Sequence, residues 1–336
     1  MTKLIKCLAK EKNSCFPVWF MRQAGRYLPE FRKIRLKNKN FIKLCLNSKL
    51  SSKITLQPLK RFDLDGAIIF SDILITPYGL GQKVNFKKNY GPVLSALDID
   101  KFLNINDKDF IRNLQPVYKA IKITRKKLNK KKSLISFVGS PWTLAVYMLG
   151  LKSKKNTLNL KLLHKKKYEI NLIIDKLVHI LSLHIKNQIK AGSDVVQLFD
   201  SWAGIIPKKE LNKYCFLPNK KIVAFCNKKK IPVICFPKGI KSNYLNFLKI
   251  VKPNAINIDY DVNPSWAKKN FKGICIQGGM NPKFMLLKKK QMIKHAEKYL
   301  KIFKNYPYIF NLGHGLLPQT NPDNVKALIK FIREYK

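Results

Sequence analysis

The sequence predicts an α/β fold in which residues 1–336 form a single-domain (β/α)8 barrel of the TIM type. Eight short apolar runs recur along the chain, and they are nearly continuous rather than alternating, as in strands buried on both faces of a parallel sheet. Longer segments with helical periodicity lie between them. Eight such units average about 42 residues each, a usual size for this fold.

The expected strands follow one another through the whole chain. In order, they are residues 17–21 (PVWFM), 66–71 (GAIIFS), 134–138 (LISFV), 194–199 (DVVQLF), 232–236 (PVICF), 255–258 (AINI), 273–277 (GICIQ) and 308–312 (YIFNL). A doubly wound open sheet is the alternative. The even spacing and the lack of an early Gly-x-Gly-x-x-Gly turn favour the barrel.

Two of the expected helices are especially clear. Residues 172–185 carry a wide apolar stripe at the i, i+3, i+4 spacing of a helix packed on a sheet. The last helix has Pro322 in its first turn and an apolar face that begins at Val325 and ends at Ile332.

Composition indicates a cytoplasmic protein with free thiols. The seven cysteines are an odd number and are scattered without a Cys-x-x-Cys pair, which fits a reducing compartment. The N-terminal stretch, rich in lysine, does not resemble a secretory signal. Charged residues interrupt the apolar segments 67–80 and 172–185 before either reaches the roughly 18 residues that a membrane span needs.

The charge balance is extreme, with 67 Lys and Arg against 19 Asp and Glu and a formal net charge of +48. Binding to nucleic acid, attraction of a polyanionic small molecule, or drift of tolerant surface positions in an A+T-rich genome would each explain it. The lysine runs are separate clusters without interleaved aromatic residues, so they lack the stacking platforms of single-strand binders. We therefore favour drift and expect no specific nucleic-acid partner.

Polar groups follow nearly every expected strand, where a barrel places its active site. Arg22, Arg26 and Arg35 lie after the first strand, in the one region where Arg clearly outnumbers Lys. Because a planar guanidinium binds a carboxylate through two parallel hydrogen bonds, these arginines point to an anionic ligand. Pairing with acidic neighbours is the structural alternative, although the chain has few acids.

Asp72 directly follows the second strand and has three possible roles. It can stabilise a developing cation, act as a general base or bind a metal. The metal role is the weakest, because no His-x-His or His-x-Cys pair accompanies Asp72.

Three further candidates follow other strands. Tyr147 lies in the helix expected after Pro141, and Ser201 ends the fourth strand without an identifiable base beside it. His314 follows the last strand between Gly313 and Gly315, whose freedom allows a close backbone approach to a ligand or a positive φ. A tight turn is the alternative for His314, and core packing is the alternative for Tyr147.

Five motifs in the same order resemble the uroporphyrinogen decarboxylase family, and they span residues 17 to about 325. They are residues 17–31 (PVWFMRQAGRYLPEF), 69–74 (IFSDIL), 139–148 (GSPWTLAVYM), 197–204 (QLFDSWAG) and 311–315 (NLGHG). The resemblance implies a (β/α)8 barrel that acts as a homodimer without cofactor or metal. It also implies conversion of uroporphyrinogen III, a tetrapyrrole with eight carboxylates, to coproporphyrinogen III by loss of four acetate carboxylates as CO2.

The resemblance also implies roles for individual residues. The segment Arg22, Gln23, Ala24, Gly25 and Arg26 matches the substrate-binding loop of the family, and Arg35 matches a further carboxylate-binding arginine. Arg22 or a neighbour is the candidate proton donor. Asp72 matches the carboxylate that meets the pyrrole N–H groups, where a fixed anion would stabilise a protonated pyrrole. Tyr147, Ser201 and His314 match positions that hydrogen-bond substrate carboxylates and shape the cleft.

The chain departs from the family pattern after the seventh strand, where residues 277–282 read QGGMNP instead of the common QGNLDP. A charge-based role of this loop is therefore in doubt. Two other functions remain as alternatives: a methyltransferase on a related barrel that uses a corrinoid or a zinc-bound thiol, and a non-catalytic basic nucleic-acid-binding protein.

Overall fold

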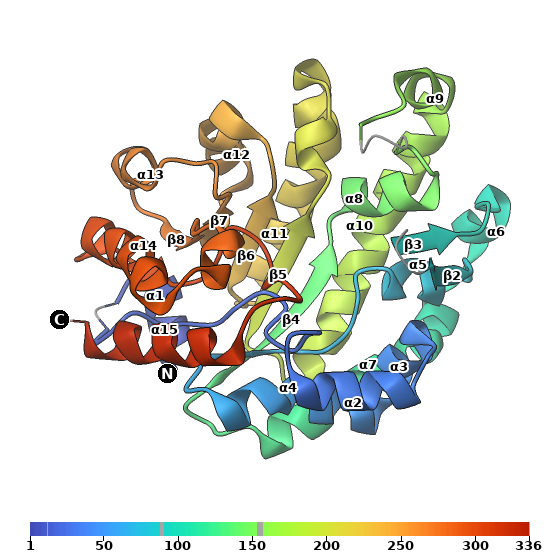
Figure 1. The fold of residues 1–336 in the computed structure, drawn as a ribbon. Helices are drawn as coiled ribbons and strands as arrows, with labels where there is room; N and C mark the ends of the chain where they lie inside the picture. Colours follow the sequence, from blue (N-terminus) through green and yellow to red (C-terminus); the bar gives the residue numbers. More distant parts are fainter. Residues whose placement is uncertain (12, 88–90, 153–156, 336) are drawn as a thin grey trace.

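Seven parallel strands curl into one sheet at the centre of the molecule (Figure 1). The computed structural model describes residues 1–11, 13–87, 91–152 and 157–335. The sheet has the order β1-β4-β5-β6-β7-β8-β9, so sequential strands of the sheet are neighbours. The strands are β1 (Gly66–Ile68), β4 (Ser133–Gly139), β5 (Val195–Asp200), β6 (Val233–Pro237), β7 (Ala255–Ile258), β8 (Cys275–Gly278) and β9 (Tyr308–Ile309).

Residues 17–21 close this sheet into a barrel. Val18 forms a parallel bridge with Phe310 beyond β9, and on its other side the Val18 carbonyl accepts a 2.9 Å hydrogen bond from the Asp65 amide just before β1. The predicted (β/α)8 barrel is therefore confirmed, although its first strand is reduced to an isolated bridge. Pro17 contributes to this shortness because it has no N–H to donate to a ladder.

Helices cover the outside of the barrel (Figure 1). They are α1 (Lys3–Leu8), α2 (Pro29–Lys37), α3 (Phe41–Leu46), α4 (Ser48–Arg61), α5 (Ile75–Gly79), α6 (Ile99–Asn104), α7 (Asp107–Lys127), α8 (Pro141–Met148), α9 (Leu160–Lys165), α10 (Lys167–Lys190), α11 (Leu217–Lys228), α12 (Tyr244–Val251), α13 (Pro264–Asn270), α14 (Lys289–Phe303) and α15 (Pro322–Glu334). The two clear helix predictions are confirmed by α10 and by α15, which bury their apolar stripes.

Asparagine side chains begin many of these helices. Asn47, Asn106 and Asn321 accept hydrogen bonds from backbone amides in the first turns of α4, α7 and α15, and Asn40 and Asn159 do the same for α3 and α9. Such a cap contributes about 1 kcal/mol to stability relative to alanine. Part of the asparagine content of the chain therefore has a structural use.

The core has an inner and an outer part, divided by strand alternation. Trp19, Ile135, Ile234 and other inward side chains fill the barrel, and the apolar face of α1 packs against this inner cluster. The much larger outer cluster lies between the strands and the surrounding helices and extends from Val18 to Ile332. Because both faces of each strand are buried, the strands read as continuous apolar runs.

A small antiparallel hairpin beside α5 and α6 was not predicted (Figure 1). Its strands are β2 (Val84–Lys87) and β3 (Gly91–Leu94). They are short and contain Asn85, Lys87 and Pro92, so they lack the apolar run that marks the barrel strands. The lysines at residues 126, 127, 130, 131 and 228–230 are exposed, as expected for solvated surface positions, whereas Arg125 and Lys132 at the ends of the first run are half-buried and form ion pairs.

Arg333 in α15 clamps the closure of the barrel. Its guanidinium donates to the carboxylates of Asp63 at 2.9 Å and Asp65 at 2.8 Å. The same Asp65 carboxylate accepts a 2.7 Å hydrogen bond from the Val18 amide. The side chain of Asp65 is only 8% exposed, whereas that of Asp63 is 65% exposed. The buried member of the clamp therefore ties the first strand to the last helix.

Replacement of Asp65 by alanine is expected to destabilise the fold by about 3–5 kcal/mol, because it leaves the Arg333 charge and the Val18 amide without their buried partner. Urea denaturation followed by circular dichroism measures the change. Asp63→Ala is the matched control and is expected to cost about 1 kcal/mol or less, since its carboxylate is exposed. Equal losses in the two variants would contradict the clamp.

Candidate active site

Arg22 lies at the carboxyl end of the closing strand in an unusual backbone conformation. Its φ of 61° is in the left-handed region, which costs a non-glycine residue about 1–3 kcal/mol. A Cβ atom on Gly315 would collide with the Arg22 side chain, so the two residues pack directly against each other. The guanidinium is thus held near the loop that carries His314.

Arg22 and Arg26 have no protein partner among the described residues, unlike other arginines of the chain. Arg61, Arg112 and Arg125 form ion pairs, as does Arg333 in the barrel clamp. The alternative that the arginine-rich loop is paired with acidic neighbours is therefore wrong for Arg22 and Arg26. Two unpaired guanidinium groups side by side provide donors for an anionic ligand.

Asp72 and Arg22 both follow strands at the same end of the barrel, which we call its mouth. They act on each other electrostatically but form no ion pair. Its carboxylate accepts a 2.9 Å hydrogen bond from the Leu74 amide at the turn that follows β1. Burial raises the pKa of Asp72 to about 6, while the Leu74 hydrogen bond and the charge of Arg22 oppose the rise. The site therefore holds a carboxylate that is costly to ionise and has spare capacity to accept hydrogen bonds from a ligand.

Tyr147 belongs to the same group of side chains. It lies near the end of α8, whose first residue is Pro141 as predicted. Burial raises the pKa of Tyr147, Asp72 adds to the rise and Arg22 opposes it, so the hydroxyl lies within the field of both charges. The ring packs edge-on against Trp202 with 6.0 Å between the centroids.

Ser201 is placed by a buried network around Asp200, the last residue of β5. The Asp200 carboxylate accepts hydrogen bonds from Ser140 at 2.9 Å and Thr143 at 2.7 Å. The Thr143 hydroxyl also accepts a 3.1 Å hydrogen bond from the Trp202 amide. These contacts fix the turn that carries Ser201 beside the wall formed by Tyr147 and Trp202. Asp200 itself is fully engaged and serves to position this turn.

His314 lies within electrostatic reach of two cations. Burial, together with the charges of Arg22 and Lys238, lowers the pKa of His314 to about 3. The imidazole is therefore neutral near pH 7. Its Nδ1 atom accepts a 2.7 Å hydrogen bond from the Gly315 amide, which leaves the proton on Nε2. His314 can thus donate a hydrogen bond but does not carry a charge.

The glycines beside His314 serve close packing rather than a positive φ. Neither Gly313 nor Gly315 has a left-handed backbone. A Cβ atom on Gly313 would collide with the backbone of Tyr260, just as one on Gly315 would meet Arg22. The last loop therefore approaches its protein neighbours closely.

The loop between the two arginines offers backbone donors. The amides of Ala24 and Gly25 make no hydrogen bond within the described part of the chain. Gln23 is fully buried, and its side chain accepts from the Phe20 amide at 3.0 Å and donates to the Gly66 carbonyl at 3.0 Å. Gln23 therefore holds the loop in place, while the amides of Ala24 and Gly25 stay free to bind a ligand.

Arg35 lies at the edge of this group. It donates to the Asn38 carbonyl at the end of α2, and its guanidinium lies 5.7 Å from the centre of the Phe41 ring. Burial raises the pKa of Cys45, Asp72 adds to the rise and Arg35 opposes it, so both charged groups act on the same thiol. Arg35 and Asp72 thus both lie near Cys45, and Arg35 keeps a backbone contact of its own.

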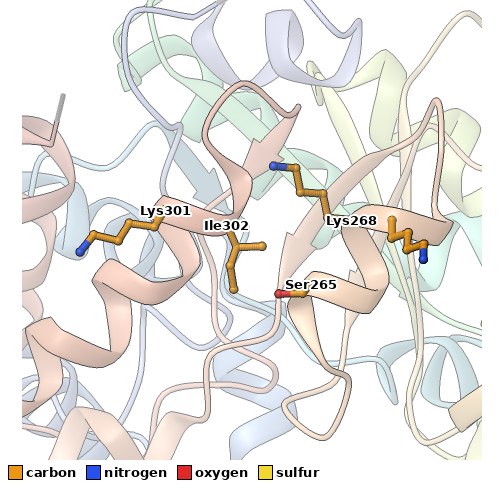
Figure 2. Close-up of a pocket in the computed structure, with 5 residues that line it drawn as sticks. Ser265, Lys268, Lys301 and Ile302 are labelled. Atoms are coloured by element: carbon orange, nitrogen blue, oxygen red, sulfur yellow. The ribbon is translucent and has the colours of Figure 1, made fainter.

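No group of three or more His, Cys, Asp or Glu side chains in the described ranges is arranged to hold a metal ion. No helix there is long and apolar enough to cross a membrane. A pocket of about 450 Å³ lies between α13 and α14, away from the expected site residues (Figure 2). Its lining of Ser265, Lys268, Lys269, Lys301 and Ile302 contains no acid or nucleophile of the kind gathered at the barrel mouth.

Comparison with known proteins gives one consistent family. The family model described as "Uroporphyrinogen decarboxylase (URO-D)" matches residues 1–335. The uroporphyrinogen decarboxylase of Rickettsia bellii is 41% identical over 343 residues, with 99% of each chain covered. That of Orientia tsutsugamushi (strain Boryong) is 40% identical and covers 100% of this chain and 99% of its own.

Solved structures support the fold. A methyltransferase from Methanosarcina mazei has a TM-score of 0.81 at 17% identity and covers 99% of this chain and 97% of its own. A B12-independent methionine synthase from Shewanella has a TM-score of 0.54 at 13% identity, covering 86% and 88%. At such identities the likeness concerns the barrel alone.

Proposed function

The chain belongs to the uroporphyrinogen decarboxylase family, and from this membership we propose how its residues act on the substrate. It decarboxylates the four acetate side chains of uroporphyrinogen III to methyl groups and so gives coproporphyrinogen III and CO2 in haem biosynthesis. The observation that carries the proposal is that Arg22 lies within electrostatic reach of both Asp72 and Arg26, while neither arginine forms an ion pair within the described ranges. Such a mouth suits a ring with carboxylates at its edge and N–H donors at its centre.

The arginines bind the edge of the substrate. Arg22 and Arg26 supply bidentate donors to carboxylates, and the free amides of Ala24 and Gly25 extend this surface. Arg35, Tyr147, Ser201 and His314 hold further carboxylates around the rim. Gln23 acts indirectly, because its hydrogen bonds shape the loop that presents the two arginines.

Asp72 receives the pyrrole N–H groups and stabilises the cation formed during catalysis. A proton delivered by Arg22 or a neighbouring donor first adds to a pyrrole ring carbon. The bond between the acetate methylene and its carboxylate then breaks, CO2 leaves, and the electron pair neutralises the ring cation. Protonation of the exocyclic carbon and loss of the ring proton give the methyl group, so each round consumes one proton. A pre-organised anion lowers the barrier because it is aimed at the charge that develops.

Incubation of the purified protein with uroporphyrinogen III under reducing conditions tests the function. We expect products with seven, six, five and finally four carboxylates, separated by chromatography, and activity that survives removal of metals with a chelator. Unchanged substrate would contradict the function. Stoichiometric zinc together with methyl transfer would instead support the methyltransferase alternative, and salt-resistant DNA binding without turnover would support the nucleic-acid alternative.

We further propose that residues 1–336 form a single domain that works as a cytoplasmic homodimer without a cofactor. The continuous outer core supports one domain, and the seven free cysteines suit a reducing compartment. The homodimer rests on the family resemblance, and sedimentation equilibrium of the purified protein would measure it.

A further inference from the structure

Lys238 directly follows β6, at the carboxyl end of the strand. Along this strand, Ile234 and Phe236 belong to the cluster inside the barrel, whereas Val233 and Cys235 belong to the outer core. Lys238 itself lies in the turn after the strand, and its amide donates to the Asp200 carbonyl at the end of β5 at 3.1 Å. Its side chain therefore starts at the end of the barrel that carries the other candidate site residues.

Lys238 is a half-buried residue, and its ammonium group makes no hydrogen bond and no ion pair within the described ranges. Burial raises the pKa of Asp259 and the charge of Lys238 opposes the rise, so the two groups lie within electrostatic reach of each other. One Asp259 carboxylate oxygen already accepts from the Gly239 amide at 2.7 Å and from the Tyr244 hydroxyl at 2.9 Å. The ammonium group of Lys238 therefore keeps its donors free for an anionic ligand.

His314 supplies a second donor beside this cation. Its Nδ1 atom is occupied by the Gly315 amide at 2.7 Å, so the imidazole presents Nε2–H as a donor. The loops that carry Lys238 and His314 both meet the loop after β7, since the Gly239 amide donates to Asp259 and Gly313 packs against Tyr260. Lys238 and Arg22 accordingly both act electrostatically on His314. A carboxylate that binds there would meet one full positive charge and one neutral N–H donor.

We propose that Lys238, together with His314, forms a carboxylate-binding subsite beyond the carboxyl ends of β6 and β9, and that Lys238 is a specificity-determining residue for a polycarboxylate ring. The inference rests on the proposed function, because it assigns one of the substrate's carboxylates to this subsite. Lysine suits the position, since a point charge tolerates the shift of a ring that must present several acetate groups in turn.

The test compares Lys238→Met with Lys249→Met. Lys249 is an exposed residue of α12, so its replacement changes the net charge equally without touching the mouth. We expect Lys238→Met to raise KM for uroporphyrinogen III and Kd for uroporphyrin, the oxidised unreactive ring with the same carboxylates, each about tenfold, with kcat little changed. Lys238→Arg is expected to restore most of the affinity, which a purely structural role would not predict.

Equal KM and Kd values in Lys238→Met and Lys249→Met would overturn the subsite. If Lys238→Met fails to fold, Lys238→Gln takes its place in the same comparison. A wild-type chain that binds uroporphyrin but releases no CO2 would refute the proposed function, while the Kd comparison would still decide the role of Lys238. A wild-type chain that neither binds nor turns over the ring would refute both.

Discussion

Replacement of Asp72 by asparagine is expected to lower kcat by about 10²–10³-fold, the usual cost of removing one pre-organised group aimed at developing charge. Asparagine keeps the size of the side chain and the capacity to accept the 2.9 Å hydrogen bond from Leu74, so the turn after β1 is retained. What it lacks is the negative charge that stabilises the protonated pyrrole. Single-turnover release of CO2 measures the chemical step directly.

The pH profile of the wild type is the companion measurement. Because the pKa of Asp72 is raised to about 6, the carboxylate ionises as pH rises through that value, and kcat/KM is expected to rise with it. The same inflection is expected to be absent from Asp72→Asn. A variant with near-normal activity, or one that keeps the inflection, would remove Asp72 from the mechanism.

The free energy of unfolding of the wild type is expected to fall as pH rises, whereas its activity rises. The folded chain favours protonated Asp72, so this contribution is present at low pH and is lost as pH rises from about 4 to about 6. Asparagine is neutral throughout. Above pH 6 the variant is therefore expected to be more stable than the wild type by up to about 3 kcal/mol. Gain of stability with loss of activity would distinguish a functional carboxylate from a structural one.

Replacement of Arg22 by lysine is expected to lower kcat/KM about 100-fold, because an ammonium group keeps the charge but cannot form the two parallel hydrogen bonds of a guanidinium. Steady-state kinetics with uroporphyrinogen III measure the loss. Arg112→Lys is the matched control, since it makes the same exchange at an exposed residue of α7 that pairs only with Asp109. A comparable loss in both variants would show that the effect of the exchange is not specific to the position of Arg22.

Arg22→Gly separates the backbone from the side chain. Glycine adopts a φ of 61° without the cost that arginine bears there, so the fold is expected to keep or gain about 1 kcal/mol of stability while substrate affinity falls. Thermal unfolding together with Kd for uroporphyrin measures the two effects. A large loss of stability would mean that the Arg22 side chain supports the fold.

The barrel was predictable because its strands are buried on both faces. Residues 134–138 and 194–199 are mostly apolar and do not alternate, and both became strands of the central sheet. The closing strand at residues 17–21 has the same sequence signal, yet only Val18 is paired, since Pro17 lacks a donor and the chain turns at Phe20. The hairpin of β2 and β3 gave no such signal.

The site was predictable in its residue types but less so in its geometry. Arg22 and Asp72 stand at strand ends, and this position marked them. The left-handed backbone of Arg22 was not predictable from the sequence, because arginine rarely adopts this conformation. Its cause is packing against Gly315, which lies nearly 300 positions further along the chain. Lys238 also follows its strand, residues 232–236, but no motif there distinguishes it from the many other lysines.

The clamp between Val18, Asp65 and Arg333 bears on synthesis of the protein in the cell. Its three members come from the beginning, the first quarter and the last few residues of the chain, so a nascent polypeptide on the ribosome has the first two long before the third. The ring cannot lock until Arg333 has been synthesised. Until then, the unpaired strand edges on either side of the unclosed barrel stay exposed. Chaperones would be needed most in this interval, because such edges are prone to aggregate.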